Sequence, residues 1–251
     1  ALFKDMVAYQ EEVRDPSRVA EVLNRVIINA KRASAPAQIN MPRDFWTQVI
    51  DIELPAIVGF ERPAGGEAAI AGAAELLSNA KFPVILNGAG VVLGGAIPAS
   101  MALAERLDAP VCVGYQHNDA FPGSHPLFAG PLGYNGSKAA LELISGADVV
   151  LCLGTRLNPF STLPGYGLNY WPSEAKIIQV DINPDRIGLT KKVAVGIVGD
   201  AKKVAEAVLA RLTPAAGNAG RAERKAKIAQ TKSAWAQALS SMDHEDDDAG
   251  T

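Results

Sequence analysis

The sequence is poor in cysteine, histidine and aromatic side chains. Its 251 residues include 2 Cys and 3 His, and aromatic residues make up 6% of the chain. Cys112 and Cys152 each lie inside an apolar run. This placement predicts two small buried side chains in a reducing cytoplasm, without a disulfide framework. Because histidine and cysteine do not recur at the spacing of metal ligands, we expect no metal site.

An excess of positive charge and long apolar runs are also missing. The 24 Lys and Arg residues stand against 27 Asp and Glu residues, for a formal net charge of −3. Nucleic-acid-binding domains usually carry a basic patch, so we expect no nucleic-acid partner. No apolar run approaches the roughly 18 residues that are needed to cross a bilayer, and no charged-then-apolar leader is present, so we expect no membrane partner.

Composition divides the chain into four parts, and we take the third as the main domain. The parts are residues 1–45, 46–65, 66–212 and 213–251. The first part predicts a helix that starts at Asp15-Pro16-Ser17 and a strand over 37–42, too little to bury a core alone. The second is rich in proline and glycine, as a linker is. The fourth is polar and helix-prone over 221–239, and its acidic end, residues 243–248, predicts a solvated tail or linker.

Strand and helix signals alternate through the third part. Strands are predicted over 83–87, 110–113, 148–153, 176–180 and 194–198, and helices over 67–80, 95–107, 136–145 and 201–212, the last capped by Asp200. The strands are apolar throughout, which is typical of a parallel sheet covered on both faces. The predicted fold class is therefore α/β, with a doubly wound parallel sheet.

Glycines follow the first of these strands, and polar residues follow the fourth. In an open parallel sheet, ligands bind beyond the carboxyl ends of the strands. Gly88 and Gly90 would allow a phosphate to approach the backbone, or they form a tight turn that binds nothing. Asp181 could accept hydrogen bonds from ribose hydroxyls, and Asn183 either takes part or simply opens a turn. A nicotinamide-dependent oxidoreductase is disfavoured, because the second strand does not end in the acidic residue of that fingerprint.

Two longer loops also follow strands and carry candidate substrate contacts. The loop over 114–126 contains His117 and Asn118, and a loop of this composition is often functional, although its histidines could simply bond to the backbone. The strand ending in Gly154 continues into Arg156, whose guanidinium could bind a phosphate, sulfonate or carboxylate, or pair with a structural carboxylate. These residues do not form a nucleophile, base and acid set, so the residues alone indicate a binding-type domain.

The order of these segments resembles the middle of the thiamine-diphosphate-dependent enzymes, acetolactate synthase and pyruvate oxidase among them. Within that superfamily, the loops are similar to those of the sulfoacetaldehyde acetyltransferase family. The segments that carry the resemblance are AQINMPRD (37–44), GYQHNDAFPGSHP (114–126), GPLGYNGSK (130–138) and TRLNPFSTLP (155–164). The resemblance implies that residues 1–45 end a pyrimidine-binding domain, that 66–212 form the central domain, and that 213–251 lead toward a diphosphate-binding domain.

The resemblance implies conversion of sulfoacetaldehyde and phosphate to acetyl phosphate and sulfite, as in the bacterial use of taurine. It implies thiamine diphosphate and Mg²⁺ as cofactors, bound through motifs before Ala1 and after Thr251, so we expect this chain alone to be inactive. FAD is not expected, which would leave Gly88, Gly90, Asp181 and Asn183 as a vestigial nucleotide site. A homodimer or homotetramer is implied for the whole protein. The alternatives are an acetolactate synthase-like carboligase or decarboxylase, and a stand-alone nucleotide-binding module without catalysis.

Overall fold

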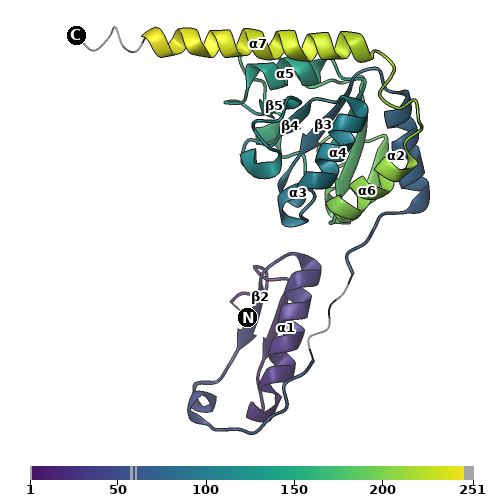
Figure 1. The fold of residues 1–251 in the computed structure, drawn as a ribbon. Helices are drawn as coiled ribbons and strands as arrows, with labels where there is room; N and C mark the ends of the chain where they lie inside the picture. Colours follow the sequence, from purple (N-terminus) through teal and green to yellow (C-terminus); the bar gives the residue numbers. More distant parts are fainter. Residues whose placement is uncertain (1, 57–58, 60, 246–251) are drawn as a thin grey trace. The chain divides into compact units, whose positions relative to one another are not determined.

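The chain folds as two compact units in a computed structural model (Figure 1). The structure describes residues 2–56, 59 and 61–245. Unit 1 is Ala1–Glu61, and unit 2 is Arg62–Thr251. The boundary between the units falls inside the segment 46–65, which the sequence predicts to be a linker. Part of the acidic end, residues 246–248, lies outside the described residues.

Unit 1 is a β-α-β arrangement with a small core. Its elements are β1 (Tyr9–Glu12), η1 (Pro16–Arg18), α1 (Val19–Ala33), β2 (Ala37–Asn40) and η2 (Arg43–Thr47). The carboxylate of Asp15 accepts a hydrogen bond from the Ser17 amide and so starts the first helical turn. Strand β1 pairs in parallel with β2. The sequence prediction of a single strand in this region was therefore wrong, because β1 is short and polar and shows no apolar pattern.

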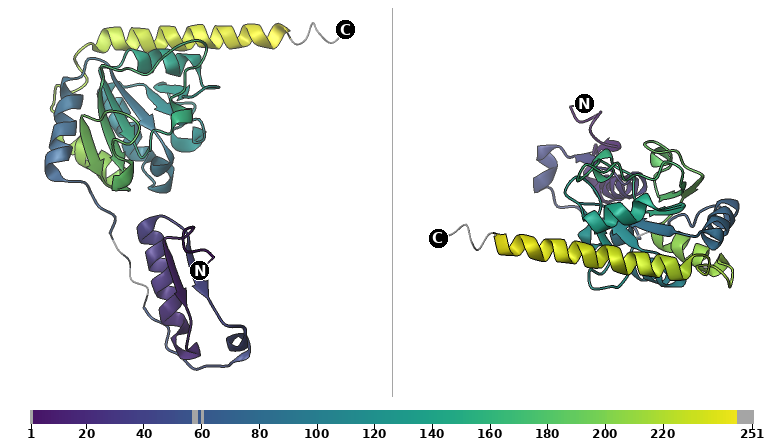
Figure 2. Two further views of the ribbon diagram at one scale, coloured as in Figure 1. Left: turned by 180° about the vertical axis from the view of Figure 1, so that it is seen from behind. Right: turned by 90° about the horizontal axis from the view of Figure 1, so that it is seen from above.

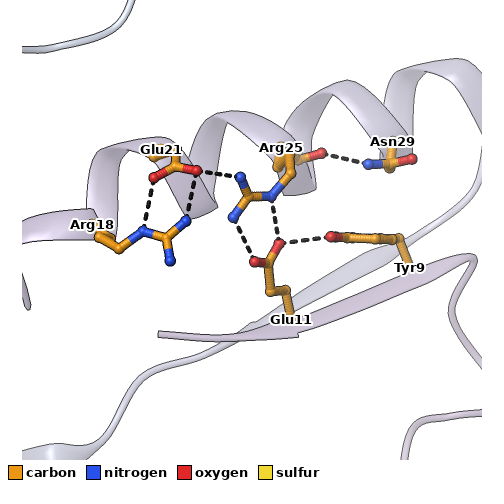
Figure 3. A network of polar contacts seen from close by, with 6 residues as sticks. All are labelled: Tyr9, Glu11, Arg18, Glu21, Arg25 and Asn29. Atoms are coloured by element: carbon orange, nitrogen blue, oxygen red, sulfur yellow. Dashed lines mark hydrogen bonds and ion pairs between the residues drawn. The ribbon is translucent and has the colours of Figure 1, made fainter. Parts of the chain in front are cut away.

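A network of ion pairs joins α1 to β1 (Figure 3). Arg25 binds both carboxylate oxygens of Glu11, at 2.6 and 2.9 Å, and also contacts Glu21 at 2.5 Å. Tyr9 donates a hydrogen bond to Glu11, and Arg18 binds Glu21 through two nitrogens. Hydrogen bonds from Arg25 and then from Tyr9 lower the pKa of Glu11 from 4.5 to about 2. Those from Arg18 and Arg25 lower the pKa of Glu21 to the same value.

We expect this network to make the packing of α1 on β1 depend on pH. Since the pKa of Glu11 is lower in the folded state, its contribution is fully present above pH 4.5 and is lost as the pH falls toward 2. The protection factors of α1 amides, which are exchange rates corrected for the intrinsic pH dependence of exchange, should therefore fall across that window when they are followed by NMR. Replacing Glu11 with Gln should reduce the dependence and leave the part that belongs to Glu21, whereas the control Glu12→Gln, on an exposed side chain of the same strand, should keep all of it. Equal profiles for the two variants would contradict this assignment.

Unit 2 is built on a six-stranded parallel sheet. In spatial order, the strands are β5 (Phe128–Pro131), β4 (Val111–Val113), β3 (Pro83–Asn87), β6 (Val149–Leu153), β7 (Lys176–Asp181) and β8 (Val195–Val198). The strand order reverses between β3 and β6, which confirms the doubly wound α/β class. Strand β5 was not predicted; it lies within a region rich in glycine and proline and pairs with β4 through an irregular register.

Helices cover both faces of the sheet (Figures 1 and 2). On one face lie α2 (Glu67–Asn79), α3 (Ala89–Leu93), α4 (Ile97–Leu107) and α6 (Ala201–Arg211), and on the other lie α5 (Lys138–Ser145) and α7 (Arg221–Glu245). Asp200 accepts hydrogen bonds from the amides of Lys202 and Lys203 at the start of α6, as predicted. Both cysteines are buried and unpaired, Cys112 in β4 and Cys152 in β6. Burial raises the pKa of both thiols.

Helix α7 packs against unit 2 and is longer than the sequence predicts. It lies along α5 and continues past it, as both views in Figure 2 show. Arg224, Ile228 and Thr231 are buried at its packed face. It ends at Glu245, so part of the predicted acidic tail is helical. The first half of this helix therefore belongs to the packed unit. None of the helices in the described part of the chain is both long and apolar enough to pass through a membrane.

Candidate functional site at the carboxyl edge of the sheet

The turn after β3 packs directly on the end of β6. The amide of Gly88 donates to the Leu153 carbonyl at 3.0 Å, and the amide of Gly90 donates to the Gly154 carbonyl at 2.8 Å. A Cβ atom on Gly88 would lie 2.6 Å from the Thr155 Cβ, and one on Gly90 would lie 2.7 Å from the Gly154 Cα. These close contacts explain why glycine is needed at both positions, even without a ligand. Both backbone amides already donate hydrogen bonds within the fold. The predicted nucleotide role of Gly88 and Gly90 stays a prediction.

The polar residues after β7 also bond within their own turn. The buried Asp181 carboxylate accepts a hydrogen bond from the Asn183 amide at 2.9 Å. The Asn183 side chain accepts one from the Asp185 amide at 2.9 Å and starts η5 (Pro184–Arg186). Both residues thus shape a turn at the edge of the sheet, next to the end of β6. Their contact with a nucleotide stays a prediction.

The remaining predicted contacts, His117, Asn118 and Arg156, lie on loops at the same edge. His117 precedes η3 (Asn118–Ala120), and its Nδ1 lies 4.0 Å from the Asp119 carboxylate. Asn118 and Arg156 are exposed. Arg156 forms no hydrogen bond or ion pair with the described residues, so its guanidinium is free to bind an anion. The next residue, Leu157, is fully buried with a φ of 54°, and this anchors the loop beside Arg156.

Two buried amide side chains that the sequence prediction missed hold these loops in place. Asn87, at the end of β3, donates to the Ala120 carbonyl at 3.0 Å and is bonded to Ser100. Gln179, in β7, donates to the Thr155 carbonyl at 3.2 Å and accepts from the Gly188 amide at 2.9 Å. Each is an amide next to buried apolar residues of its strand, and a buried amide must form hydrogen bonds. That pattern could have identified both residues.

The loops after β4, β5 and β6 meet one another. A Cβ on Gly133 would lie 2.9 Å from the Phe160 carbonyl oxygen and 3.4 Å from the Tyr115 Cβ. Tyr170 donates to the Ser161 carbonyl at 3.0 Å, and burial raises the pKa of Tyr170 to about 12. The aromatic side chains that these loops expose are Tyr115, Tyr134, Phe160 and Tyr166. The edge of the sheet therefore presents one continuous surface that includes the loops of His117 and Arg156.

The site contains no set of carboxylates for a metal ion. Among the described residues, no group of three or more His, Cys, Asp or Glu side chains could hold a metal. Asp200, in Gly199-Asp200-Ala201, caps α6 and pairs with Arg62 at 3.0 Å. Its carboxylate is therefore committed to the fold. The geometry at this edge suits the binding of an anion, with Arg156 as the cation.

A comparison with known families decides where this domain belongs. Residues 70–208, more than half of the chain, match the family described as the thiamine pyrophosphate enzyme, central domain. The chain belongs to this family. Two solved structures share the fold of this central domain. Benzoylformate decarboxylase from Polynucleobacter necessarius has a TM-score of 0.68 and 24% identity, over 83% of this chain and 39% of that one. A putative thiamin diphosphate-dependent enzyme from Mycobacterium smegmatis has a TM-score of 0.67 and 24% identity, over 84% and 40%.

Sequence relatives extend the similarity beyond the central domain. The chain is 79% identical over all of its 251 residues to the sulfoacetaldehyde acetyltransferase of Roseovarius nubinhibens, and 71% identical to that of Rhodobacter capsulatus. In both cases it covers 42% of the relative. A probable acetolactate synthase large subunit of Methanocaldococcus jannaschii is 34% identical, over 84% of this chain and 36% of that protein. The chain thus spans less than half of the length of these curated relatives.

Proposed function

We propose that this chain is the central part of a sulfoacetaldehyde acetyltransferase. The reaction converts sulfoacetaldehyde and phosphate to acetyl phosphate and sulfite. The observation that carries the proposal is 79% identity over the whole chain to a protein of that name, against 34% to a probable acetolactate synthase. The identity extends through unit 1 and α7, on either side of the residues that the central-domain family matches. We propose a homodimer or homotetramer for the whole protein.

The cofactor of this family is thiamine diphosphate, and we propose that Mg²⁺ accompanies it. The described residues do not form a site for that pair. Among them, no three or more His, Cys, Asp or Glu side chains come together as a metal site requires. The carboxylate of Asp200 already caps α6 and pairs with Arg62. We therefore assign to this chain no reaction step that involves the cofactor. Its proposed contribution is to hold the substrates.

We propose that the loops over 114–136 and 155–166 form an edge of the entrance to the active site. Both substrates are anions, a sulfonate and a phosphate, and a guanidinium binds either through paired hydrogen bonds. Arg156 supplies such a group without an internal partner among the described residues. His117 and Asn118 lie on the neighbouring loop, which Asn87 holds against β3. Arg156 is the residue to which we assign the anion, with His117 and Asn118 as secondary contacts.

A chimera tests the proposed function. This chain replaces the matching segment of the Roseovarius nubinhibens protein, which spans 42% of that protein. With thiamine diphosphate and Mg²⁺ added, the purified chimera should form acetyl phosphate and sulfite from sulfoacetaldehyde and phosphate. Pyruvate serves as the competing donor. A folded chimera that uses pyruvate and ignores sulfoacetaldehyde, while the unmodified Roseovarius protein uses sulfoacetaldehyde, would overturn the proposal.

Within the chimera, Arg156→Ala should raise the KM for phosphate or for sulfoacetaldehyde by about tenfold or more, the effect of losing one charged contact. Arg156→Lys should recover part of the loss, because the charge returns without the paired geometry. The matched control is Arg186→Ala, since Arg186 is also exposed and lies in η5, which follows the neighbouring strand β7. Initial rates over a range of both substrates provide the measurement. Unchanged kinetics for Arg156→Ala would remove Arg156 from the site.

A further inference from the structure

A groove of about 680 Å³ lies within unit 2, beside the residues that lead into the amino ends of β4 and β5. Its walls come from α7, from the end of α4 and from the segment 125–127. The volume falls in the range of small-molecule sites in proteins. The apolar part of the lining includes Pro126, Leu127, Ile228 and Ala229. The polar part decides what the groove can bind.

Most polar groups in the lining are already paired. The Leu127 amide donates to Nδ1 of His125 at 3.1 Å, so the ring hydrogen lies on Nε2, which faces Glu105 at 3.3 Å. Both nitrogens of His125 are thereby used. Asp108 is paired with Arg221 at 2.5 Å and with Lys225 at 3.1 Å. The charge of Asp108 is thus compensated by two cations, whereas the mostly exposed Glu105 carboxylate contacts, among the described residues, only the His125 ring.

Lys232 is different. Its Nζ donates to the Pro126 carbonyl at 2.7 Å, and it has no carboxylate partner among the described residues. Burial lowers the pKa of this ammonium, so its charge is incompletely solvated. Two of its three donors can serve a ligand. An anion beside Lys232 would gain a charge-assisted hydrogen bond and compensate the lost solvation.

The position of Lys232 on α7 sets the shape of the ligand. Lys225 and Lys232 are seven residues apart, two turns along one helix face. Ile228 and Ala229 lie between them and line the groove. The lining holds two ammonium groups, those of Lys225 and Lys232, and two carboxylates, those of Glu105 and Asp108. Because Lys225 is paired with Asp108, the ammonium of Lys232 is the cation at one end of the apolar wall that a ligand can pair with.

We propose that this groove binds an organic carboxylate with an apolar chain, its carboxylate on Lys232 and its chain against Leu127 and Ile228. The groove contains none of His117, Asn118 and Arg156, to which we assign the substrates, and the proposal does not depend on the proposed function. A carboxylate complements the free ammonium, and an alkyl chain complements the wall of the groove.

Octanoate is the probe, added to the 251-residue chain and followed by amide NMR shifts. We expect saturable shifts at Leu127, Ile228 and Ala229 with a dissociation constant of about 1 mM, the affinity that a ligand of this size reaches. Lys232→Met should weaken binding about tenfold. The matched control, Lys227→Met, removes an exposed ammonium from the same helix outside the groove and should leave binding unchanged. 1-Octanol, which has the chain without the charge, should bind about tenfold more weakly.

A second variant tests the groove while Lys232 is kept, so that its result does not depend on how the fold tolerates the loss of Lys232. Ala229→Phe adds a ring at an exposed position in the groove and should block octanoate without removing a hydrogen bond. Spectra of both variants without octanoate report whether the fold is retained. The proposal fails if octanoate gives no saturable shift in the groove, or if octanol binds as tightly as octanoate. Equal binding by the Lys232→Met and Lys227→Met variants would likewise overturn it.

Discussion

Replacing Arg224 with methionine should lower the free energy of unfolding of unit 2 by about 4 kcal/mol, an unusually large effect for one side chain. Arg224 is only 1% exposed, although it lies in a polar helix. Its guanidinium donates to the carbonyls of Leu107 and Asp108 at 2.8 and 3.0 Å, where α4 ends. It also bonds to carbonyls in the turn before α7 and ahead of β3, those of Gly217, Ala219 and Lys81.

Methionine fills a similar volume but supplies none of these donors, so buried carbonyls would lose their partners. A single hydrogen bond to a charged group contributes about 1.5–3 kcal/mol, and contributions from one side chain are not additive. For a unit of this size, the loss corresponds to a fall in Tm of about 10 °C. Thermal and urea unfolding, read at amide signals of β3 and β6, separates unit 2 from unit 1.

Arg221→Met is the control for this prediction. Arg221 pairs with Asp108 from a half-exposed position one turn earlier on the same helix, and Lys225 keeps a second contact to that carboxylate. Because the Arg221 guanidinium is half exposed and Lys225 still compensates the buried Asp108 carboxylate, this variant should lose only about 1 kcal/mol. If the two variants lose equal stability, the backbone contacts of Arg224 are not what holds α7 and its preceding turn to the sheet.

The sequence predicted the parts of the fold that have a strong apolar pattern. Five of the six strands of unit 2 match predicted runs, because a strand buried on both faces is mostly apolar, as β3, β4 and β6 are, and the edge strand β8 keeps an apolar sequence as well. Strands β1 and β5 were missed for the opposite reason. Strand β1 is the polar sequence YQEE, and β5 includes a glycine and a proline. Each of these strands forms by pairing with a strand that is distant in the sequence. A local sequence pattern carries no information on such pairing.

The candidate site was predicted less completely than the fold. The loops of His117 and Arg156 could be identified because each follows a predicted strand. The topology of a parallel sheet brings the carboxyl ends of its strands to one edge. The role of Gly88 and Gly90 could not be read from the sequence, because it depends on contact with Gly154, 64 residues beyond Gly90. Arg224 was missed because its partners are backbone carbonyls, which leave no signature in the sequence.

The contact between the β3 turn and the end of β6 leads to the second large prediction. Gly154→Ala should lower the free energy of unfolding by about 3 kcal/mol. Gly154 has a φ of +61°, in the left-handed region that an alanine adopts at a cost of about 1–2 kcal/mol. A Cβ there would also lie 2.7 Å from the Gly90 Cα and 2.9 Å from the Val91 amide nitrogen. Relieving those contacts requires the turn after β3 to move away from β6.

Gly167→Ala separates the two causes. Gly167 has a similar φ of +71°, but nothing lies within 4 Å of the position of its Cβ. Alanine there should lose only the backbone contribution, about 1 kcal/mol. Urea unfolding of both variants, read at amide signals of β3 and β6, measures the difference. An excess loss in Gly154→Ala, with amide shifts at Gly88, Gly90 and Val91, would establish that these glycines are required for packing in a protein without any ligand. Equal losses of stability would mean that the turn after β3 moves away at little cost in free energy. Packing would then not explain Gly88 and Gly90, and a role in ligand binding would be favoured.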